Sequence, residues 1–240
     1  MTTSVSSATP QKTDTRPPGR RQQLVEVSVF LLLIVLSMLL SFFVVRQGGL
    51  RFTIVAVSTI VRDLSLMSLV LFFAWRNGES LGRIGWTFSG KWREVALGVG
   101  LFLPFFYGVG LVGTALEAAG FSTPSTPLPS FLTARGTGES LLAIILVAVV
   151  AITEETIFRG YLILRFTGAF LHPGLAVFLS AGIFSLGHGY EGSAGVITVG
   201  IMGVVLALIY LWRKSLVAPI VIHFLQDFLG IVLLPLLRGS

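Results

Sequence analysis

The chain has 240 residues, of which 54% are hydrophobic and only 12% are charged, and its mean hydropathy is +0.89. Because soluble domains are about one quarter charged, this composition excludes an ordinary soluble protein and predicts a membrane protein with several spans. The formal net charge of +6 is spread over single basic residues between apolar runs, so it forms no basic patch and excludes nucleic acid as a partner.

The N-terminal tail, residues 1–23, is rich in Ser, Thr, Pro and Arg. It holds too little apolar surface to fold, so we expect a disordered cytoplasmic tail. The apolar run that follows, 24–45, is too long for the apolar segment of a signal peptide and lacks a small-residue cleavage site. It is therefore predicted to be the first membrane span.

Further apolar runs continue along the chain, and a helix that crosses a bilayer needs about 20 such residues. The sequence accordingly predicts an all-α fold, a polytopic transmembrane helical bundle of about seven spans. The spans lie at 24–45, 52–75, 95–116, 141–168, 174–188, 194–212 and 216–236. No soluble stretch is long enough to fold separately. The predicted organisation is the tail, N-terminal membrane helices at 24–116 and a C-terminal core at 139–236.

The 17 Lys and Arg residues are divided unevenly between the two sides of this bundle. Lys and Arg collect on cytoplasmic loops, and with the tail inside, twelve lie on that side, four lie outside and Arg62 lies within a span. The twelve are Lys12, Arg16, Arg20, Arg21, Arg76, Arg83, Lys91, Arg93, Arg159, Arg165, Arg213 and Lys214. We therefore predict a cytoplasmic N-terminus. The proline-rich connection 117–138 cannot be a regular helix and is expected to face outside.

Two charged neighbours, Arg62 and Asp63, lie inside the second predicted span. Adjacent residues point about 100° apart on a helix, so these two are expected to be poor partners for each other. Each is expected to pair with a group on a neighbouring helix, and neither is assigned a catalytic role.

Two adjacent glutamates, Glu154 and Glu155, follow the apolar run 141–152. Placing a carboxylate at the centre of a bilayer costs free energy, so such a residue is expected to have an ion-pair partner or a functional role there. Glu155 and Arg159 are four residues apart on one helical face, and an ion pair between them is expected. Glu154 points away from that pair and therefore remains available as a catalytic residue. Taken alone, the motif fits equally well with two carboxylates that cap or pair near a cytoplasmic helix end.

Two histidines complete the set of acid–base groups expected at membrane depth. His188 ends the segment Phe184-Ser185-Leu186-Gly187-His188, and Phe184 could pack beside its imidazole one turn away. His223 and Asp227 are four residues apart, and such an aspartate can hold the ring N–H and fix the tautomer. A lone histidine is more often a core residue bonded to a carbonyl, but three such elements in one chain are hard to explain by packing.

The depth of these groups constrains the fourth predicted helix. His188 lies 15 residues after Pro173, where its helix is expected to begin on the cytoplasmic side. Glu154 reaches the same depth only if its helix continues to about Gly168, 14 residues further on. We therefore predict one long helix, in which Arg159 and Arg165 face protein or snorkel to the interface.

Together these residues resemble a known family. The patterns Glu154-Glu155-x-x-x-Arg159-Gly160, Phe184-x-x-x-His188 and His223-x-x-x-Asp227 are similar to the three motifs of the CPBP family of CAAX proteases and bacteriocin-processing enzymes. The resemblance covers roughly 139–230. Its members include type II CAAX prenyl endopeptidases, intramembrane enzymes that remove the last three residues of prenylated proteins. The third motif of the family ends in Asn or Asp, so Asp227 is within the pattern.

The resemblance implies a role for each of these residues. Glu154 would activate the attacking water, His188 and His223 would complete the site, Glu155 and Arg159 would organise it, and Asp227 would orient its neighbours. Two mechanisms stay open. Glu154, His188 and His223 are a possible zinc ligand set with an open water position. Alternatively Glu154 is a metal-free base, and the other groups stabilise the oxyanion. The chain has no cysteine to add a ligand, and it lacks a His-Glu-x-x-His motif.

The expected function is thus an intramembrane endopeptidase that acts on a membrane protein or lipidated peptide. The plain Pro/Ser/Thr tail and the absence of an organelle signal fit a bacterial plasma membrane, where the family's biology does not lead us to expect prenylated CAAX proteins. The oligomeric state cannot be read from the sequence. One alternative is a non-catalytic membrane protein of the same family that acts in immunity or secretion. Another is a proton-coupled transporter, for which the buried Glu and His would form a relay. No internal repeat is visible in the sequence, which disfavours the transporter.

Overall fold

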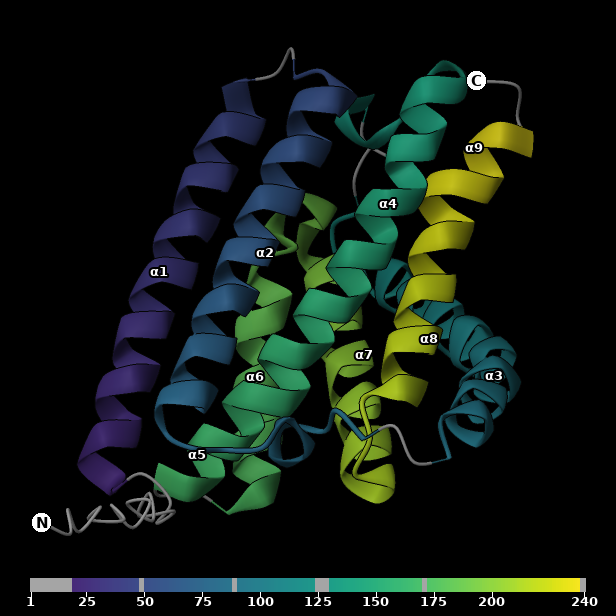
Figure 1. The fold of residues 1–240 in the computed structure, drawn as a ribbon. Coiled ribbons are helices and arrows are strands. Elements are labelled where there is room, and N and C mark those ends of the chain that lie inside the picture. Colours follow the sequence, from purple (N-terminus) through teal and green to yellow (C-terminus); the bar gives the residue numbers. More distant parts are fainter. Residues whose placement is uncertain (1–18, 48–49, 88–89, 124–129, 170–171, 238–240) are drawn as a thin grey trace, which may run out of the picture.

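The computed structural model describes residues 19–47, 50–87, 90–123, 130–169 and 172–237, and within these ranges every regular element is helical (Figure 1). The all-α prediction is therefore confirmed. The helices longer than ten residues are α1 (Arg20–Gln47), α2 (Phe52–Arg76), α3 (Lys91–Ala118), α4 (Gly136–Glu154), α6 (Pro173–Leu186), α7 (Gly192–Arg213) and α8 (Val217–Asp227). Shorter helical segments are η1 (Leu81–Ile84), η2 (Ser130–Leu132), η3 (Glu155–Leu162), α5 (Ile163–Ala169), η4 (Gly189–Glu191), η5 (Phe228–Leu233) and α9 (Leu234–Leu237).

Six helices of the described chain are long and apolar enough to cross a membrane, close to the seven predicted. The exception is α6, whose 14 residues span only about 21 Å, less than the apolar thickness of a bilayer. The first helix begins at Arg20, four residues earlier than predicted, whereas residues 1–18 of the tail lie outside the described residues. Most of the proline-rich connection, 124–129, lies outside them too.

The long fourth helix is confirmed, since α4, η3 and α5 form one continuous apolar helix from Gly136 to Ala169. Its middle part, η3, is a π-helix, and all eight residues of this segment are buried. A second π-helix, η5, continues α8. Such segments are rare and occur frequently at functional sites. Here each begins directly after a residue of the expected site, Glu154 in one case and Asp227 in the other.

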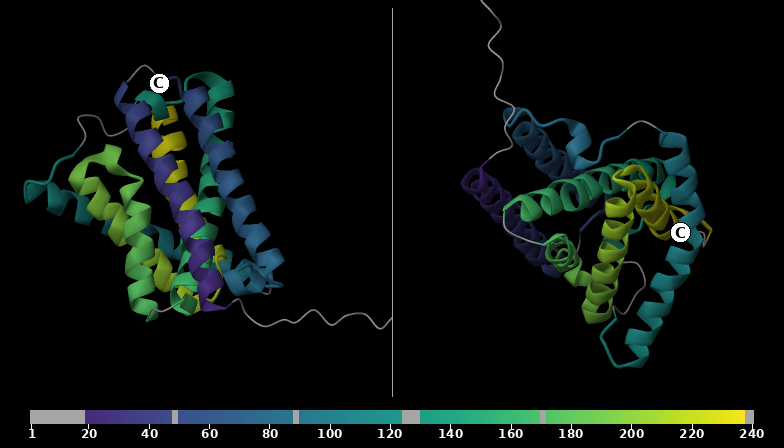
Figure 2. Two further views of the ribbon diagram at one scale, coloured as in Figure 1. Left: turned by 90° about the vertical axis from the view of Figure 1, so that its left-hand side faces the viewer. Right: turned by 90° about the horizontal axis from the view of Figure 1, so that it is seen from below.

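The helices enclose the long fourth helix on several sides. The strongest packing joins α2 to α4, α6 to α7, and α3 to α8. In Figure 1, α1, α2, α4 and α8 lie in a row, and the views in Figure 2 show α3 at the outside of the bundle. Buried Phe105, Leu206 and Ile222 fill the junction of α3, α7 and α8. The fourth helix is thereby held between the N-terminal helices and the C-terminal ones.

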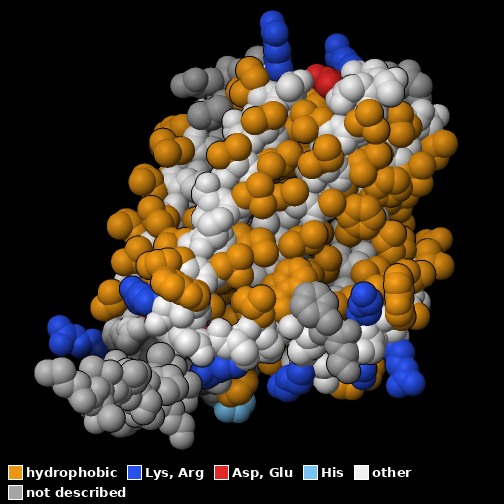
Figure 3. Space-filling view, viewed as in Figure 1, with side chains coloured by type: hydrophobic (Ala, Val, Ile, Leu, Met, Phe, Trp, Pro, Cys, Tyr) orange, Lys and Arg blue, Asp and Glu red, His pale blue; other side chains and the backbone are white. Residues whose placement is uncertain are grey.

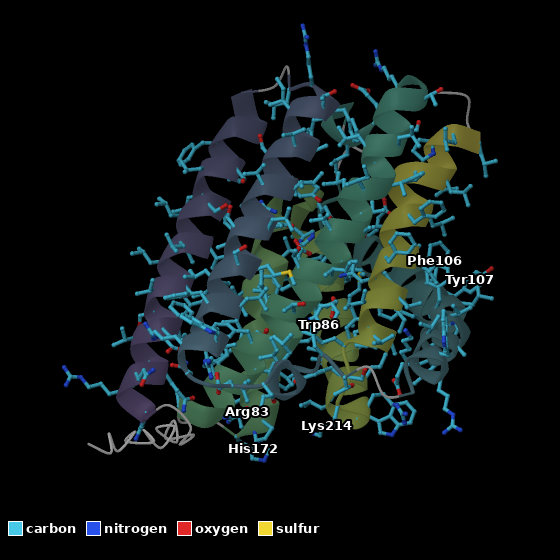
Figure 4. The ribbon with its side chains drawn as sticks, in the orientation of Figure 1. Arg83, Trp86, Phe106, Tyr107, His172 and Lys214 are labelled. Carbon is cyan, nitrogen blue, oxygen red and sulfur yellow. The ribbon has the colours of Figure 1, made fainter. Side chains whose placement is uncertain are left out.

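The surface has the pattern of a protein surrounded by lipid. Hydrophobic side chains cover the middle of the face in Figure 3, and Lys and Arg side chains gather at its two ends. Phe106 and Tyr107 project outward from α3, whereas Arg83, His172 and Lys214 lie at the end where α1 begins (Figure 4). Apolar side chains are stable against acyl chains and charged ones against water and headgroups. With six spanning helices, this is a multi-pass membrane protein.

A buried ion-pair network closes the end of the bundle where α1 begins. Arg165 is 1% exposed, contacts both carboxylate oxygens of Glu79, and places Nε 3.3 Å from Glu26. Arg76 pairs with Glu26 at 2.6 Å, and Arg83 pairs with Glu79 at 3.1 Å. Arg165 therefore faces protein, one of the two positions predicted for it. The network ties α1, α2 and the loop after α2 to the end of the fourth helix.

Candidate active site

The two adjacent glutamates lie where α4 passes into η3, and they have different surroundings. The Glu155 side chain is fully buried, whereas that of Glu154 is 15% exposed and lines a cavity. Glu154 Oε2 makes no hydrogen bond to the described part of the protein. The structure thus places one carboxylate in the interior and the other on an open wall, as the helical spacing predicted.

Arg159 lies one turn below Glu155 and is 2% exposed, with Nη1 2.9 Å from Glu155 Oε1. The predicted ion pair is therefore present. The guanidinium also stacks on the ring of Phe184 at 4.4 Å. A charge at this depth is costly without partners, and the carboxylate and the aromatic face supply them.

His223 is the residue that links the two glutamates. Its Nδ1 lies 2.8 Å from Glu155 Oε1, and its Nε2 lies 3.9 Å from Glu154 Oε2 and 3.4 Å from Asp227 Oδ2. The predicted contact with Asp227 is present. The short hydrogen bond that orients the ring, however, goes to Glu155 on another helix, which residue spacing could not show.

His188 lies in the turn after α6, and its Nδ1 is 3.2 Å from the Phe184 carbonyl oxygen. Phe184 packs beside it at 5.0 Å, as predicted, and meets His223 edge-on at 6.1 Å. His188 makes no ion pair with Glu154 within the described chain, although both line the same cavity. The structure therefore brings Glu154, Glu155, Arg159, His223 and Asp227 together, and His188 lines the same cavity without a direct contact to Glu154.

The cavity that these residues line has a volume of about 1400 Å³. On α1 it is lined by residues between Ile34 and Phe42, and on α2 by residues between Ile54 and Leu66. Both segments belong to the half of the bundle away from the start of α1. Beneath the cavity lie buried apolar side chains, among them Tyr161 and Phe166, and then the ion-pair network. Packed side chains therefore fill the end of the bundle where α1 begins, and the cavity lies in the other half.

Arg62 and Asp63 of α2 line this cavity as well, next to Glu154. The expectation that they are poor partners was wrong, since Arg62 Nε and Nη2 both lie 2.8 Å from Asp63 Oδ1. The Arg side chain is long enough to fold back onto its neighbour, and a medium of low dielectric favours the pair. Asp63 Oδ2 also accepts a hydrogen bond from Thr153 Oγ1 at 3.4 Å, which is the neighbouring-helix contact that was expected for it.

The predicted zinc ligands are only partly assembled. Both histidines turn Nδ1 toward an oxygen, Glu155 for His223 and the Phe184 carbonyl for His188. This arrangement leaves Nε2 facing other groups, as in many metal-bound histidines. Within the described residues, however, no three His, Cys, Asp or Glu side chains are grouped closely enough to hold one ion. The side chains as placed do not form a ligand set, so we derive no catalytic step through a metal.

Several features of the site could not be predicted from the sequence pattern. Ser180 Oγ donates a hydrogen bond to the Phe158 carbonyl at 2.6 Å and so fastens α6 to η3. The two π-helices and the Glu155–His223 bond are likewise products of packing between helices. For Arg62 and Asp63 the signal was present, because charged residues inside a span mark functional positions by default.

The C-terminal part of the chain matches a known family. Residues 137–229 match the family model described as type II CAAX prenyl endopeptidase Rce1-like. The match contains all six predicted site residues and confirms the family resemblance. It supports an intramembrane protease at the level of the family. Helices α1 to α3 lie outside the matched range. No curated protein and no solved structure matched the chain.

Proposed function

We propose that the Rce1-like domain makes this protein an intramembrane endopeptidase that cleaves a membrane protein or a lipidated peptide. The observation that carries the proposal is the arrangement around Glu154. Its carboxylate has an oxygen without a protein partner, lines the cavity and lies near the Nε2 atom of His223. A carboxylate so placed can accept a proton from a water molecule that attacks a peptide carbonyl.

The reaction can be written with this chain's own residues. Water attacks the carbonyl carbon, and its proton passes to Glu154. In its protonated form His223 donates Nδ1–H to Glu155 and Nε2–H to the oxyanion, which lowers the free energy of the tetrahedral intermediate. When the C–N bond breaks, Glu154 returns its proton to the leaving amine. Arg159 holds Glu155 in place, and His188 contacts the substrate from the wall of the cavity.

The cavity is suited to a membrane-associated substrate. It is lined largely by apolar side chains of several spanning helices, and Glu154 is one of its charged lining groups. A lipid-bearing segment can therefore remain in an apolar setting while its peptide bond reaches the carboxylate. The distribution of Lys and Arg supports a cytoplasmic N-terminus, and the plain Pro/Ser/Thr tail without an organelle signal supports a bacterial plasma membrane.

The test is cleavage by the purified full-length protein in liposomes, with quenched fluorescent peptides that carry a prenylated cysteine near the C-terminus. We expect Glu154→Gln to abolish cleavage and leave the fold intact. The control is Glu139→Gln, a glutamate at the far end of the same helix whose carboxylate bonds Thr53 and the Arg135 amide. Equal activity of Glu154→Gln and the wild type would refute the proposal. Comparing membrane-protein C-termini in cells with and without active enzyme would then identify the natural substrate.

A further inference from the structure

Arg62 has a special place in the cavity. It is the only Lys or Arg among the described residues that line the cavity, and its side chain is 34% exposed. The same walls carry five acidic side chains: Asp63, Glu117, Glu154, Glu191 and Asp227. An anionic group that enters this space is repelled by these acidic side chains and attracted by one fixed cation.

The Arg62 guanidinium has N–H donors that Asp63 does not use. Nε and Nη2 are directed at a single oxygen of Asp63, and the described residues offer Arg62 no other hydrogen bond or ion pair. Because a guanidinium carries five N–H donors, Nη1 and the outer N–H of Nη2 remain for a ligand. These donors form the planar edge that binds a carboxylate through two parallel hydrogen bonds.

Asp63 fixes the position of this edge relative to the catalytic helix. Its side chain is 4% exposed, with one oxygen on Arg62 and the other on Thr153 of α4. Thr153 directly precedes Glu154, and α2 packs along α4. Arg62 is therefore held at a set place beside the proposed base.

From this arrangement, and resting on the proposed function, we propose that Arg62 is a specificity-determining residue that binds a carboxylate of the substrate peptide, with Asp63 as its positioning residue. One cation among five acidic side chains fixes the carboxylate at one point and so sets which peptide bond lies over Glu154. The pair comes from α2, outside the matched family range, so this selectivity belongs to the N-terminal helices.

The test uses the full-length protein and three prenylated peptides: one with a free C-terminal carboxylate, one with a C-terminal amide, and one with a free carboxylate in which Asp or Glu side chains are replaced by Asn or Gln. We expect Arg62→Gln to raise KM for the first peptide about 10- to 100-fold, the loss expected for a hydrogen bond to a charged group. The kcat value should change little. Arg62→Lys should give an intermediate KM, because an ammonium keeps the charge but loses the planar edge.

The peptides also separate the two possible sources of the carboxylate. Weak binding of the amide alone assigns the C-terminus, and weak binding of the third peptide alone assigns a side chain. Arg62→Gln leaves the Asp63 carboxylate without its partner and could therefore destabilise the protein. The double variant Arg62→Gln/Asp63→Asn removes that carboxylate and serves as the control for loss of fold. Thermal unfolding compares the stability of the two variants. If the wild type cleaves all three peptides with the same KM, or if Arg62→Gln raises every KM equally, the inference fails and the proposed function stands. If the wild type neither cleaves nor binds any peptide, both fail.

Discussion

Glu154 and Glu155 differ in their surroundings because adjacent residues point in different directions on a helix. Glu155 turns inward, where Arg159 and His223 both reach Oε1 at 2.9 Å and 2.8 Å. Glu154 turns to the cavity and keeps an oxygen without a protein partner. In a low-dielectric interior a carboxylate with two cationic or hydrogen-bonding partners supports the structure, and one without them is available for reaction.

This division predicts different effects of two substitutions on stability. Arg159→Ala should lower the free energy of unfolding by about 3–5 kcal/mol, because it leaves the buried Glu155 carboxylate without its guanidinium. Glu154→Gln should change it by less than about 0.5 kcal/mol, as expected where no partner is lost. Activity should fall in both variants.

Thermal unfolding of the two variants in the same detergent measures the difference. Arg159→Lys is the matched control, since it retains the charge and should recover part of the lost stability. Equal destabilisation by Arg159→Ala and Glu154→Gln would show that the assignment of structural and reactive roles is mistaken.

At the scale of the element, η3 explains how the fourth helix can pack so tightly around the site. All its residues are buried, and Gly160 lies against the backbone of η1, where an added Cβ would overlap the Ile84 carbonyl oxygen. The carbonyl belongs to backbone held beside a buried core and cannot move aside easily. Gly160 is therefore needed for a close approach of two segments rather than for an unusual backbone conformation.

Gly160→Ala should accordingly destabilise the protein by about 1–3 kcal/mol, the usual cost of overpacking. The matched control is Gly182→Ala on α6, where an added Cβ meets nothing within 4 Å. That change should be neutral or slightly stabilising, because Ala is the better helix former. Melting temperatures of the two variants give the comparison, and a loss of stability as large in Gly182→Ala as in Gly160→Ala would contradict this account of η3.

At the scale of the whole molecule, the orientation in the membrane decides from which side the cavity is reached. Arg159 and Arg165 were counted with the cytoplasmic residues, but both are buried inside the fourth helix. Among the basic side chains that the structure describes, eight still favour the end where α1 begins, against Arg51 and Arg135 at the other end. With that orientation the cavity occupies the non-cytoplasmic half of the bundle.

Single cysteines can test this orientation cleanly, since the chain has none of its own. We expect Thr137→Cys, in the first turn of α4 at the end away from the start of α1 (Figure 1), to react with a membrane-impermeant thiol reagent in intact cells. Ser80→Cys, at the opposite end, should react only after lysis. Both positions are exposed. The reverse labelling pattern would place the N-terminus outside and the cavity on the cytoplasmic side.

Metal removal should affect the whole molecule little. The fold rests on apolar packing between helices and on buried ion pairs, with no closed set of metal ligands among the described residues. We expect the circular dichroism melting curve to be unchanged by a chelator, even if activity proves to need zinc. A fold that collapses on chelation, as small zinc domains do, would show a structural metal and overturn this view of the site.

The sequence alone determined what depends on local spacing and composition. Apolar runs predicted the helices, and a separation of four residues predicted the Glu155–Arg159 and His223–Asp227 contacts, because both follow from the geometry of a single helix. The cost of charge in lipid marked the fourth helix as functional. The three motifs were sufficient to identify the family.

Only the tertiary structure decided what depends on contacts between helices. The bond from Glu155 to His223 joins residues 68 positions apart, and the Asp63–Thr153 bond joins residues 90 apart. Whether Arg62 folds back on Asp63, which end of the bundle is filled and where a helix widens into a π-segment are set by the packing of neighbours. These features depend on three-dimensional complementarity, which hydrophobic periodicity and residue spacing along one helix do not encode.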